Sequence, residues 1–348
     1  MPLPGSEPFA RVERALRGAA GRAFTGAVAR IECDGRLRFE RAYGVTRLDG
    51  EASPVYADTR FDLASITKVF ISTLALRLVG EGLLSLDEPL HRLLEEWREA
   101  PFDRITLRML LAHDSGMNSG ADYRTILGEN VERFALLRPL ITAPGERVIY
   151  SDLGFIALGA AIARAKQRAL PALVREAFGR PTLGFRPFAG ARAAIPATED
   201  DGWRGRVQGV VHDEKAYLMG GVAGHAGLFG TAADAGFLAQ AYLSALRGRP
   251  QSVLPEALAA EAVREQAGDP VLRRGLGWAL KTTDENSCGG RFGMRSFGHT
   301  GFVGTCIWAD PDREVAAVLL TNSVYFGRSD TRDLRAAFYD AVMEDLGR

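Results

Sequence analysis

Cysteine is scarce in this chain of 348 residues, which has three: Cys33, Cys288 and Cys306. They form no C-x-x-C pair, and an odd number of widely spaced cysteines suits neither a disulfide framework nor a structural zinc site. We therefore expect free thiols in a reducing compartment, and no metal or other cofactor.

The chain also lacks an excess of charge. Lys plus Arg and Asp plus Glu both number 43, so the formal net charge is zero. Proteins that neutralise nucleic-acid phosphates normally carry a basic excess, so nucleic acid is not an expected partner. Lysine itself is rare, and because nearly all basic residues are arginine, a lysine in an unusual place stands out. The four are Lys68, Lys166, Lys215 and Lys281.

Long hydrophobic runs are absent as well. No stretch of roughly 18 apolar residues occurs, so no membrane span is expected. The N-terminal segment lacks the basic stretch and apolar run of a signal peptide, which predicts a cytoplasmic protein. What the chain does have is 47% hydrophobic and 25% charged residues, the mixture of a globular protein with a large core.

Strand-like patterns lie at both ends of the chain. Near the N-terminus, runs at 24–33 and 37–43 flank Asp34-Gly35, a strong hairpin signal. Near the C-terminus, runs at 303–309 and 314–321 flank a second turn segment, 310–313. Apolar residues at helical spacing occur between these ends, from residue 65 to about 80 and in short segments from 85 to 200, and again in the last residues of the chain.

These patterns predict an α/β protein of the α+β type. An antiparallel sheet formed from both chain ends would be flanked by helices, with a mainly helical domain inserted. The expected domains are 1–75 together with 215–348, and 76–214, with the active site between them.

The segment Ser65-Ile66-Thr67-Lys68 opens the helix predicted from residue 65. Positions i and i+3 share a helix face, so the amine of Lys68 can reach the hydroxyl of Ser65. Unpaired N–H groups at the helix N-terminus could stabilise an oxyanion. Apolar surroundings would lower the pKa of Lys68 and let it act as a base. The alternative is a serine N-cap followed by a surface lysine.

Two further motifs favour catalysis: Tyr150-Ser151-Asp152 precedes an apolar helical run, and His299-Thr300-Gly301 precedes a predicted strand. S-x-x-K, Y-x-N and K-T-G or H-T-G in this order resemble the pattern of the serine β-lactamase and penicillin-binding-protein family. Its members include class C β-lactamases, DD-peptidases and related carboxylesterases. The segments LLAHDSGM (110–117) and VHDEKAYLMGGVAGHAGLFGT (211–231) are similar to segments of its β-lactamase-related branch.

The resemblance extends from about residue 20 to 345 and implies a β-lactamase/DD-peptidase-like fold. It also implies a catalytic role for three residues. Ser65 would be the acylated nucleophile, Lys68 would help to deprotonate it, and Tyr150 would carry protons to the leaving group and from water. A phenol suits this role when nearby cations favour its deprotonated form, and Lys68 and His299 are the candidates.

The substrate side is also implied by the resemblance. The Thr300-Gly301 edge would bind substrate, with Gly301 letting the ligand approach the backbone closely. The N–H groups of Ser65 and Phe302 would form the oxyanion hole, each contributing about 3 kcal/mol. His225, in a glycine-rich loop, would line the mouth of the site or hold the loop.

One departure from the family pattern is Asp152, where the pattern has Asn. An ionised Asp cannot donate to a substrate amide carbonyl, which favours esters or another role such as pairing with Lys68. A rival register would make Ser151 the proton carrier and place Leu153 at the amide position. We prefer Tyr150, because in the rival register the apolar Leu153 would stand where the pattern has an amide.

The second departure is His299 in place of Lys. The Lys of the pattern supplies a fixed positive charge that binds a substrate carboxylate, and a neutral His would weaken this interaction. Lys281-Thr282-Thr283 is a decoy: it lacks the glycine of K-T-G, and we interpret it as a strand end. His113 is expected to hold a helix end.

The sequence thus predicts a serine hydrolase that acts on small esters or D-amino-acid-like peptides through an acyl-enzyme. A β-lactamase or acyltransferase on the same scaffold, or a non-catalytic binding protein, is the alternative. The expected partner is a small-molecule substrate, with neither nucleic acid nor membrane.

Overall fold

The computed structural model describes residues 8–120, 122–249, 253–268, 273–283 and 286–348. Its centre is a six-stranded sheet in which all neighbouring strands are antiparallel. In their order across the sheet, the strands are β2 (Arg36–Gly44), β1 (Gly26–Cys33), β11 (Val315–Thr321), β10 (Cys306–Asp310), β9 (Phe297–Thr300) and β8 (Ala279–Leu280). This is the predicted sheet from both chain ends.

Turn chemistry and strand pairing fix the sheet. Asp34 and Gly35 both have positive φ, 54° and 70°, as a two-residue turn between β1 and β2 requires. β1 pairs with β11 along its length, from Ala27 opposite Thr321 onward. The two ends of the chain therefore meet in the middle of the sheet.

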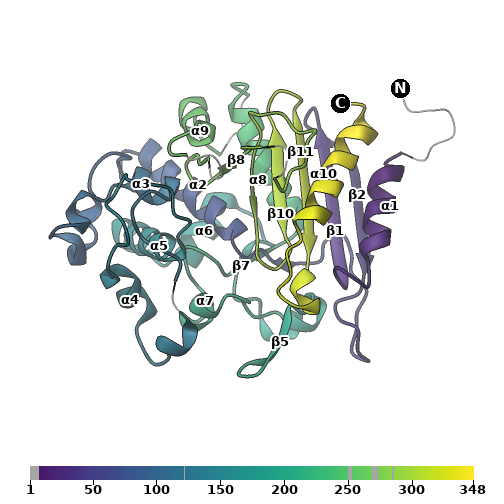
Figure 1. Ribbon diagram of the computed structural model, residues 1–348, viewed down its shortest axis with the longest axis horizontal. Coiled ribbons are helices and arrows are strands. Elements are labelled where there is room, and N and C mark those ends of the chain that lie inside the picture. The colour runs from purple at the N-terminus through teal and green to yellow at the C-terminus, as the bar shows by residue number, and fades with distance from the viewer. Residues whose placement is uncertain (1–7, 121, 250–252, 269–272, 284–285) are drawn as a thin grey trace.

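Helices cover both faces of the sheet (Figure 1). α1 (Ala10–Ala19) and α10 (Arg332–Leu346) pack together on one face, and α8 (Ala232–Ala245) packs on the other. Successive strand residues point to opposite faces. Trp308 accordingly lies in the core beneath α1 and α10, whereas Ile307 lies in the core shared with α8.

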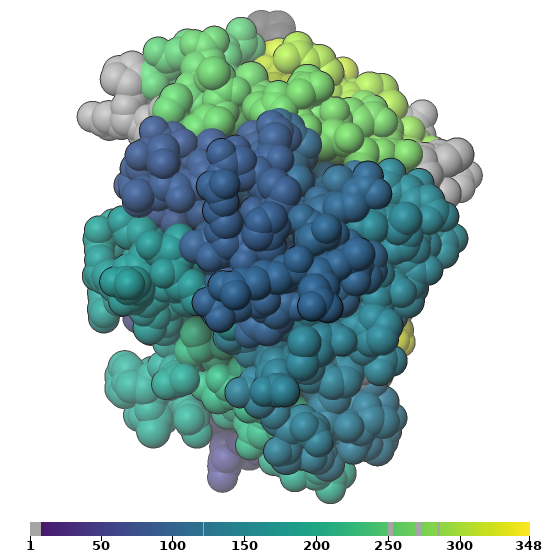
Figure 2. Space-filling view, turned by 90° about the vertical axis from the view of Figure 1, so that its left-hand side faces the viewer, coloured from purple at the N-terminus to yellow at the C-terminus, as the bar shows by residue number. Residues whose placement is uncertain are grey.

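The middle of the chain is mainly helical and forms the side of the molecule seen in Figure 2, where blue to teal residues make most of the surface. Two of its helices, α2 and α5, are buried along nearly their whole length, as apolar helices inside a core are. The helices of this region are α2 (Ile66–Gly80), α3 (Leu107–Ala112), α4 (Val131–Leu137), α5 (Asp152–Lys166) and α6 (Leu170–Phe178).

Shorter elements complete the fold. β3 (Phe61–Asp62), β7 (Leu228–Gly230) and β4 (Gly184–Phe185) form a small sheet, and β5 (Glu199–Asp201) pairs with β6 (Gly205–Val207). The remaining α-helices of the described chain are α7 (Glu214–Leu218) and α9 (Glu256–Val263).

One segment differs from its predicted form. Residues 86–97, which have a helical pattern, form two 3-10 turns, η1 (Leu90–Arg92) and η2 (Glu95–Trp97). Pro89 has no N–H and restricts the residue before it, so a helix cannot run through this point. The domain boundaries stay predictions, and α2 continues across residue 75. Within the described residues, no helix combines the length and apolar character needed to cross a bilayer.

Candidate active site

Ser65 immediately precedes α2 and is half-buried. The turn before it is held by the buried carboxylate of Asp62, whose Oδ1 accepts a hydrogen bond from the N–H of Ala64 at 2.8 Å. Ala64 has a φ of 46°, a left-handed conformation that costs about 1–2 kcal/mol for a residue with a Cβ. This held turn sets where α2 begins and therefore where the Ser65 hydroxyl lies.

Lys68 is fully buried one helical turn after Ser65. Its Nζ donates to Oγ of Ser65 at 3.1 Å, to Oδ1 of Asp152 at 2.8 Å and to the carbonyl of His225 at 3.2 Å. An ammonium has three N–H donors, and here each one has an acceptor. The geometry is that of a charged lysine that donates to the serine.

The electrostatics of Lys68 agree with this geometry and contradict the sequence-based expectation. Burial disfavours the ammonium, but Asp152 and the hydroxyl of Tyr150 favour it more strongly, so the pKa of Lys68 is raised. The expectation of a lowered pKa was wrong because it did not include Asp152 as a counter-charge. Lys68 therefore stays charged at neutral pH and cannot take the proton of Ser65.

Tyr150 lies just before α5, with its ring against charged and aromatic neighbours. Nζ of Lys68 is 4.8 Å from the ring centre, and the guanidinium of Arg274 is 5.4 Å from it. The rings of His113 and His299 lie 4.7 Å and 6.1 Å away. Two cations, Lys68 and Arg274, thus face Tyr150. The sequence analysis expected His299, not Arg274, as the second cation.

The rival register of the second motif is not supported by the geometry. Ser151 is the N-cap of α5: its Oγ accepts from the N–H of Gly154 at 2.8 Å and donates to the carbonyl of Asn118 at 2.9 Å. Leu153 is fully buried. Ser151 is therefore a capping residue, and Leu153 belongs to the core.

Asp152 uses both of its oxygens on lysines. Oδ1 accepts from Lys68 at 2.8 Å, and Oδ2 lies 3.2 Å from Nζ of Lys215. Burial raises the pKa of Asp152, but Lys68, His225 and Lys215 lower it more, and the net direction is down. Asp152 is thus an ionised partner of lysines, and its oxygens are not directed at a substrate.

His225 is buried and does not line the mouth of the site. Its Nε2 lies 2.7 Å from Oδ1 of Asp213, and Oδ2 of Asp213 lies 3.6 Å from Nζ of Lys215. Ligand atoms of Asp152, Asp213 and His225 lie within 4.8 Å of one another, as at a metal site. Here the ammonium groups of Lys68 and Lys215 already neutralise both carboxylates, so these residues do not fit a resident metal.

His299 ends β9 together with Thr300. Its Nδ1 is 2.8 Å from the carbonyl of Thr300, which fixes Nδ1 as the donor and leaves Nε2 as an acceptor. Burial, Arg274 and Lys68 lower the pKa of His299 to about 3. The ring is therefore neutral at physiological pH and adds no fixed charge.

Gly301 is required by packing. A Cβ at this position would lie 2.1 Å from Oγ1 of Thr305 and 2.8 Å from the carbonyl of Leu63. This differs from the expected role in ligand approach: the glycine lets the end of β9 pack against the turn that carries Ser65. Among the described residues, the N–H groups of Ser65 and Phe302 have no hydrogen-bond acceptor, as an oxyanion hole requires.

A cleft of about 200 Å³ opens beside Tyr150. Its lining includes His299, Thr300 and two arginines, Arg273 and Arg274. The decoy Lys281 is not among the lining residues; it is buried, and its Nζ donates to the carbonyls of residues 290 and 292 at 3.0 and 2.6 Å. His113 ends α3 and accepts from the N–H of Ser151 at 3.0 Å, a structural role.

Sequence reasoning missed three residues of the site: Asp213, Lys215 and Arg274. Asp62 was expected to be either solvated or a capping residue, and it is buried and caps the turn before Ser65. The rarity of lysine was a usable signal for Lys215, which lies in a segment already similar to the family. Nothing local marks Arg274, because its contact with the ring of Tyr150 joins residues far apart in the chain.

Comparisons with known proteins agree with this geometry. The family model described as Beta-lactamase matches residues 9–341. Esterase EstB of Burkholderia gladioli is 32% identical over 374 residues, covering 92% of this chain and 91% of that protein. N-acetylmuramyl-L-alanine amidase of Bacillus subtilis (strain 168) is 30% identical over 356 residues, covering 90% and 80%. The solved structure of EstCE1, a hydrolase with promiscuous acyltransferase activity, has the same fold, with a TM-score of 0.78, 22% identity and coverage of 95% and 97%.

Proposed function

The chain belongs to the beta-lactamase family and is a serine hydrolase, and from this premise we propose that it forms an acyl-enzyme on Ser65. One observation carries the proposal: the ammonium of a fully buried lysine lies 3.1 Å from the hydroxyl of the serine that immediately precedes α2. A buried cation at a serine hydroxyl stabilises negative charge that develops on that oxygen.

In acylation, Oγ of Ser65 passes its proton to the oxygen of Tyr150 and attacks the substrate carbonyl carbon. The N–H groups of Ser65 and Phe302 stabilise the oxyanion, while Lys68 stays charged beside Oγ. Tyr150 gives the proton to the departing alcohol or amine as that bond breaks. In deacylation, water passes a proton to Tyr150 and attacks the acyl carbon, and Ser65 regains the proton as the ester breaks.

The substrate is a small ester or a D-amino-acid-like peptide. Asp152 replaces the amide donor of the family pattern and is occupied by two lysines, which supports esters. Arg274, in the cleft beside Tyr150, supports substrates with a carboxylate near the reacting carbonyl. β-Lactamase and acyltransferase activities are the alternatives on the same acyl-enzyme. A cytoplasmic location stays a prediction.

A chromogenic ester assay on wild type and Ser65→Ala tests the proposal, together with labelling by a fluorophosphonate. Turnover and labelling that both vanish in Ser65→Ala support it. Turnover that persists in the variant would show that another residue is the nucleophile. A wild type with neither turnover nor label would favour a binding protein on this scaffold.

A further inference from the structure

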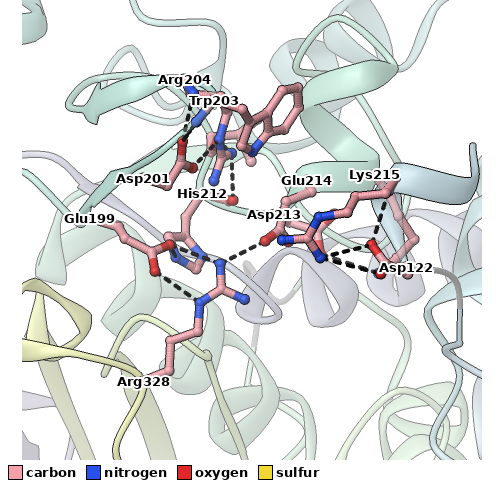
Figure 3. Close-up of polar contacts among 12 residues, drawn as sticks. Asp122, Glu199, Asp201, Trp203, Arg204, His212, Asp213, Glu214, Lys215 and Arg328 are labelled. Carbon is pink, nitrogen blue, oxygen red and sulfur yellow. Dashed lines mark hydrogen bonds and ion pairs between the residues drawn. The ribbon is translucent and has the colours of Figure 1, made fainter. Parts of the chain in front are cut away.

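The segment His212–Lys215 joins the residues around Ser65 to several separate parts of the chain. The N–H of His212 donates at 2.7 Å to Asp62, which holds the turn before the serine. Glu214 pairs with Arg328 at 2.6 Å (Figure 3). The proposed catalytic steps use none of these side chains. The contacts of the other two residues of the segment, Asp213 and Lys215, lead directly to Asp152.

Asp213 and Lys215 close a ring of hydrogen bonds and ion pairs behind the serine. Lys68 contacts Asp152 at 2.8 Å, Asp152 contacts Lys215 at 3.2 Å, and Lys215 contacts Asp213 at 3.6 Å. Asp213 contacts the ring of His225 at 2.7 Å, and the carbonyl of His225 accepts from Lys68 at 3.2 Å. Every member of this ring touches the next one.

We propose that Asp213 and Lys215 are positioning residues of the active site, which hold Asp152 ionised and in place so that Lys68 keeps its charge and its contact with the serine. This inference rests on the proposed acyl-enzyme on Ser65. It assigns control of the charge on Lys68 to Lys215 and Asp213.

Burial explains why one carboxylate is not enough. The side chain of Lys68 is 0% exposed and that of Lys215 is 11% exposed, so neither ammonium is well solvated. A buried charge is costly unless it is paired and hydrogen-bonded. Without Lys215, Oδ2 of Asp152 would lose its partner, and the carboxylate could turn away from Lys68. Asp213 in turn is fixed as the N-cap of α7, where Oδ1 accepts from the N–H of Ala216 at 2.8 Å.

The charged and titratable groups that face Asp152 come from three places. α2 supplies Lys68, the start of α7 supplies Asp213 and Lys215, and the loop before β7 supplies His225. On the side of the cleft, Nζ of Lys68 also faces the ring of Tyr150. Arg274 and His299 lie next to the same ring. Of these groups, Lys215 is the cation that bonds Asp152 without touching the serine.

The test measures kcat/KM for a chromogenic ester from pH 3 to 9 in wild type, Lys215→Met and Lys215→Arg. Removing the cation raises the pKa of Asp152, so the acid limb of Lys215→Met should move up by about one pH unit. Lys215→Arg keeps the charge and should return the limb toward its original position. Lys166→Met is the control, because Lys166 pairs with Glu81 at 3.7 Å at the far end of α5; its profile should match wild type.

A second variant keeps the test valid if Lys215→Met does not fold, which circular dichroism would show. Asp213→Asn keeps the positive charge of Lys215 but loosens its position, so kcat/KM should fall about tenfold with no upward shift of the acid limb. Unchanged kcat/KM in Asp213→Asn, or an unchanged limb in folded Lys215→Met, would overturn the inference. If fluorophosphonate does not label Ser65 in wild type, the proposed function itself fails; labelled wild type with unaltered variants refutes the positioning role alone.

Discussion

Nζ of Lys68 lies 2.8 Å from Oδ1 of Asp152, and this contact decides how the site works. A lysine in an apolar pocket without a counter-charge would lose its proton and act as a base. Paired with Asp152, Lys68 has a raised pKa and stays charged. In the mechanism that we propose, proton transfer therefore falls to Tyr150, while the ammonium supplies electrostatic stabilisation.

Replacing Lys68 with alanine should reduce ester kcat/KM by roughly a thousandfold or more, because it removes the cation next to the attacking oxygen. Lys166→Ala is the matched control and should retain the wild-type rate. Steady-state kinetics and thermal unfolding on both variants separate catalysis from folding. Near-normal activity in a folded Lys68→Ala protein would remove Lys68 from the mechanism.

Changing Asp152 to asparagine should lower the rates on esters and amides alike. The substitution deprives Lys68 of its counter-charge, and breaking a buried ion pair from one side costs about 3 kcal/mol or more of stability. The measurement is kcat/KM for an ester and an amide of the same acyl group, at a temperature where the variant is folded. A marked rise in the amide-to-ester ratio would mean instead that residue 152 faces the substrate.

His299 should make the protein less stable in mild acid. Its pKa is about 3 in the folded protein, against 6.5 normally. Between these values the unfolded chain binds a proton that the folded protein does not, so stability falls as the pH falls. From pH 7 to 5 this loss is about 2 kcal/mol, and His299→Gln should abolish it. Urea unfolding at both pH values checks this; the lowered pKa of His113 acts in the same direction in both proteins, so the difference between them reports His299. Equal losses in the two proteins would contradict the assignment.

Gly301→Ala should destabilise the protein by about 1–3 kcal/mol, since its Cβ would overlap Thr305 and the carbonyl of Leu63. Ester hydrolysis should fall as well, because Leu63 belongs to the turn that carries Ser65. Gly50→Ala is the control, because nothing lies within 4 Å of the added Cβ and the backbone there has no positive φ. Chemical denaturation and kinetics of both variants give the comparison. A fully stable, active Gly301→Ala protein would show that the close packing is not needed.

Local patterns were enough to predict much of the fold. The Asp34-Gly35 turn predicted the first hairpin, and apolar spacing predicted α2, because turn chemistry and periodicity depend on neighbouring residues. The strand from residue 314 was also predicted locally. Pro89 shows the limit: a helical pattern was assigned where proline prevents a continuous helix.

The site was predictable where its motif is local and not where the fold joins distant segments. Ser65 and Lys68 are three residues apart, and their contact follows from helix geometry. The charge state of Lys68 depends on Asp152, which is 84 residues away, and the role of Lys215 depends on the same carboxylate. No window of sequence contains these pairs. Pairing of Asp152 with Lys68 was one alternative from the sequence, and the direction of the Lys68 pKa shift depended on which alternative held.

The most direct test of the acyl-enzyme is mass spectrometry of the intact protein and its peptides after exposure to a panel of activated acyl donors and a fluorophosphonate. We predict one adduct per chain, located on the peptide that contains Ser65 and absent in Ser65→Ala. An adduct on a different serine, or wild-type protein that stays unmodified by every donor, would contradict the account.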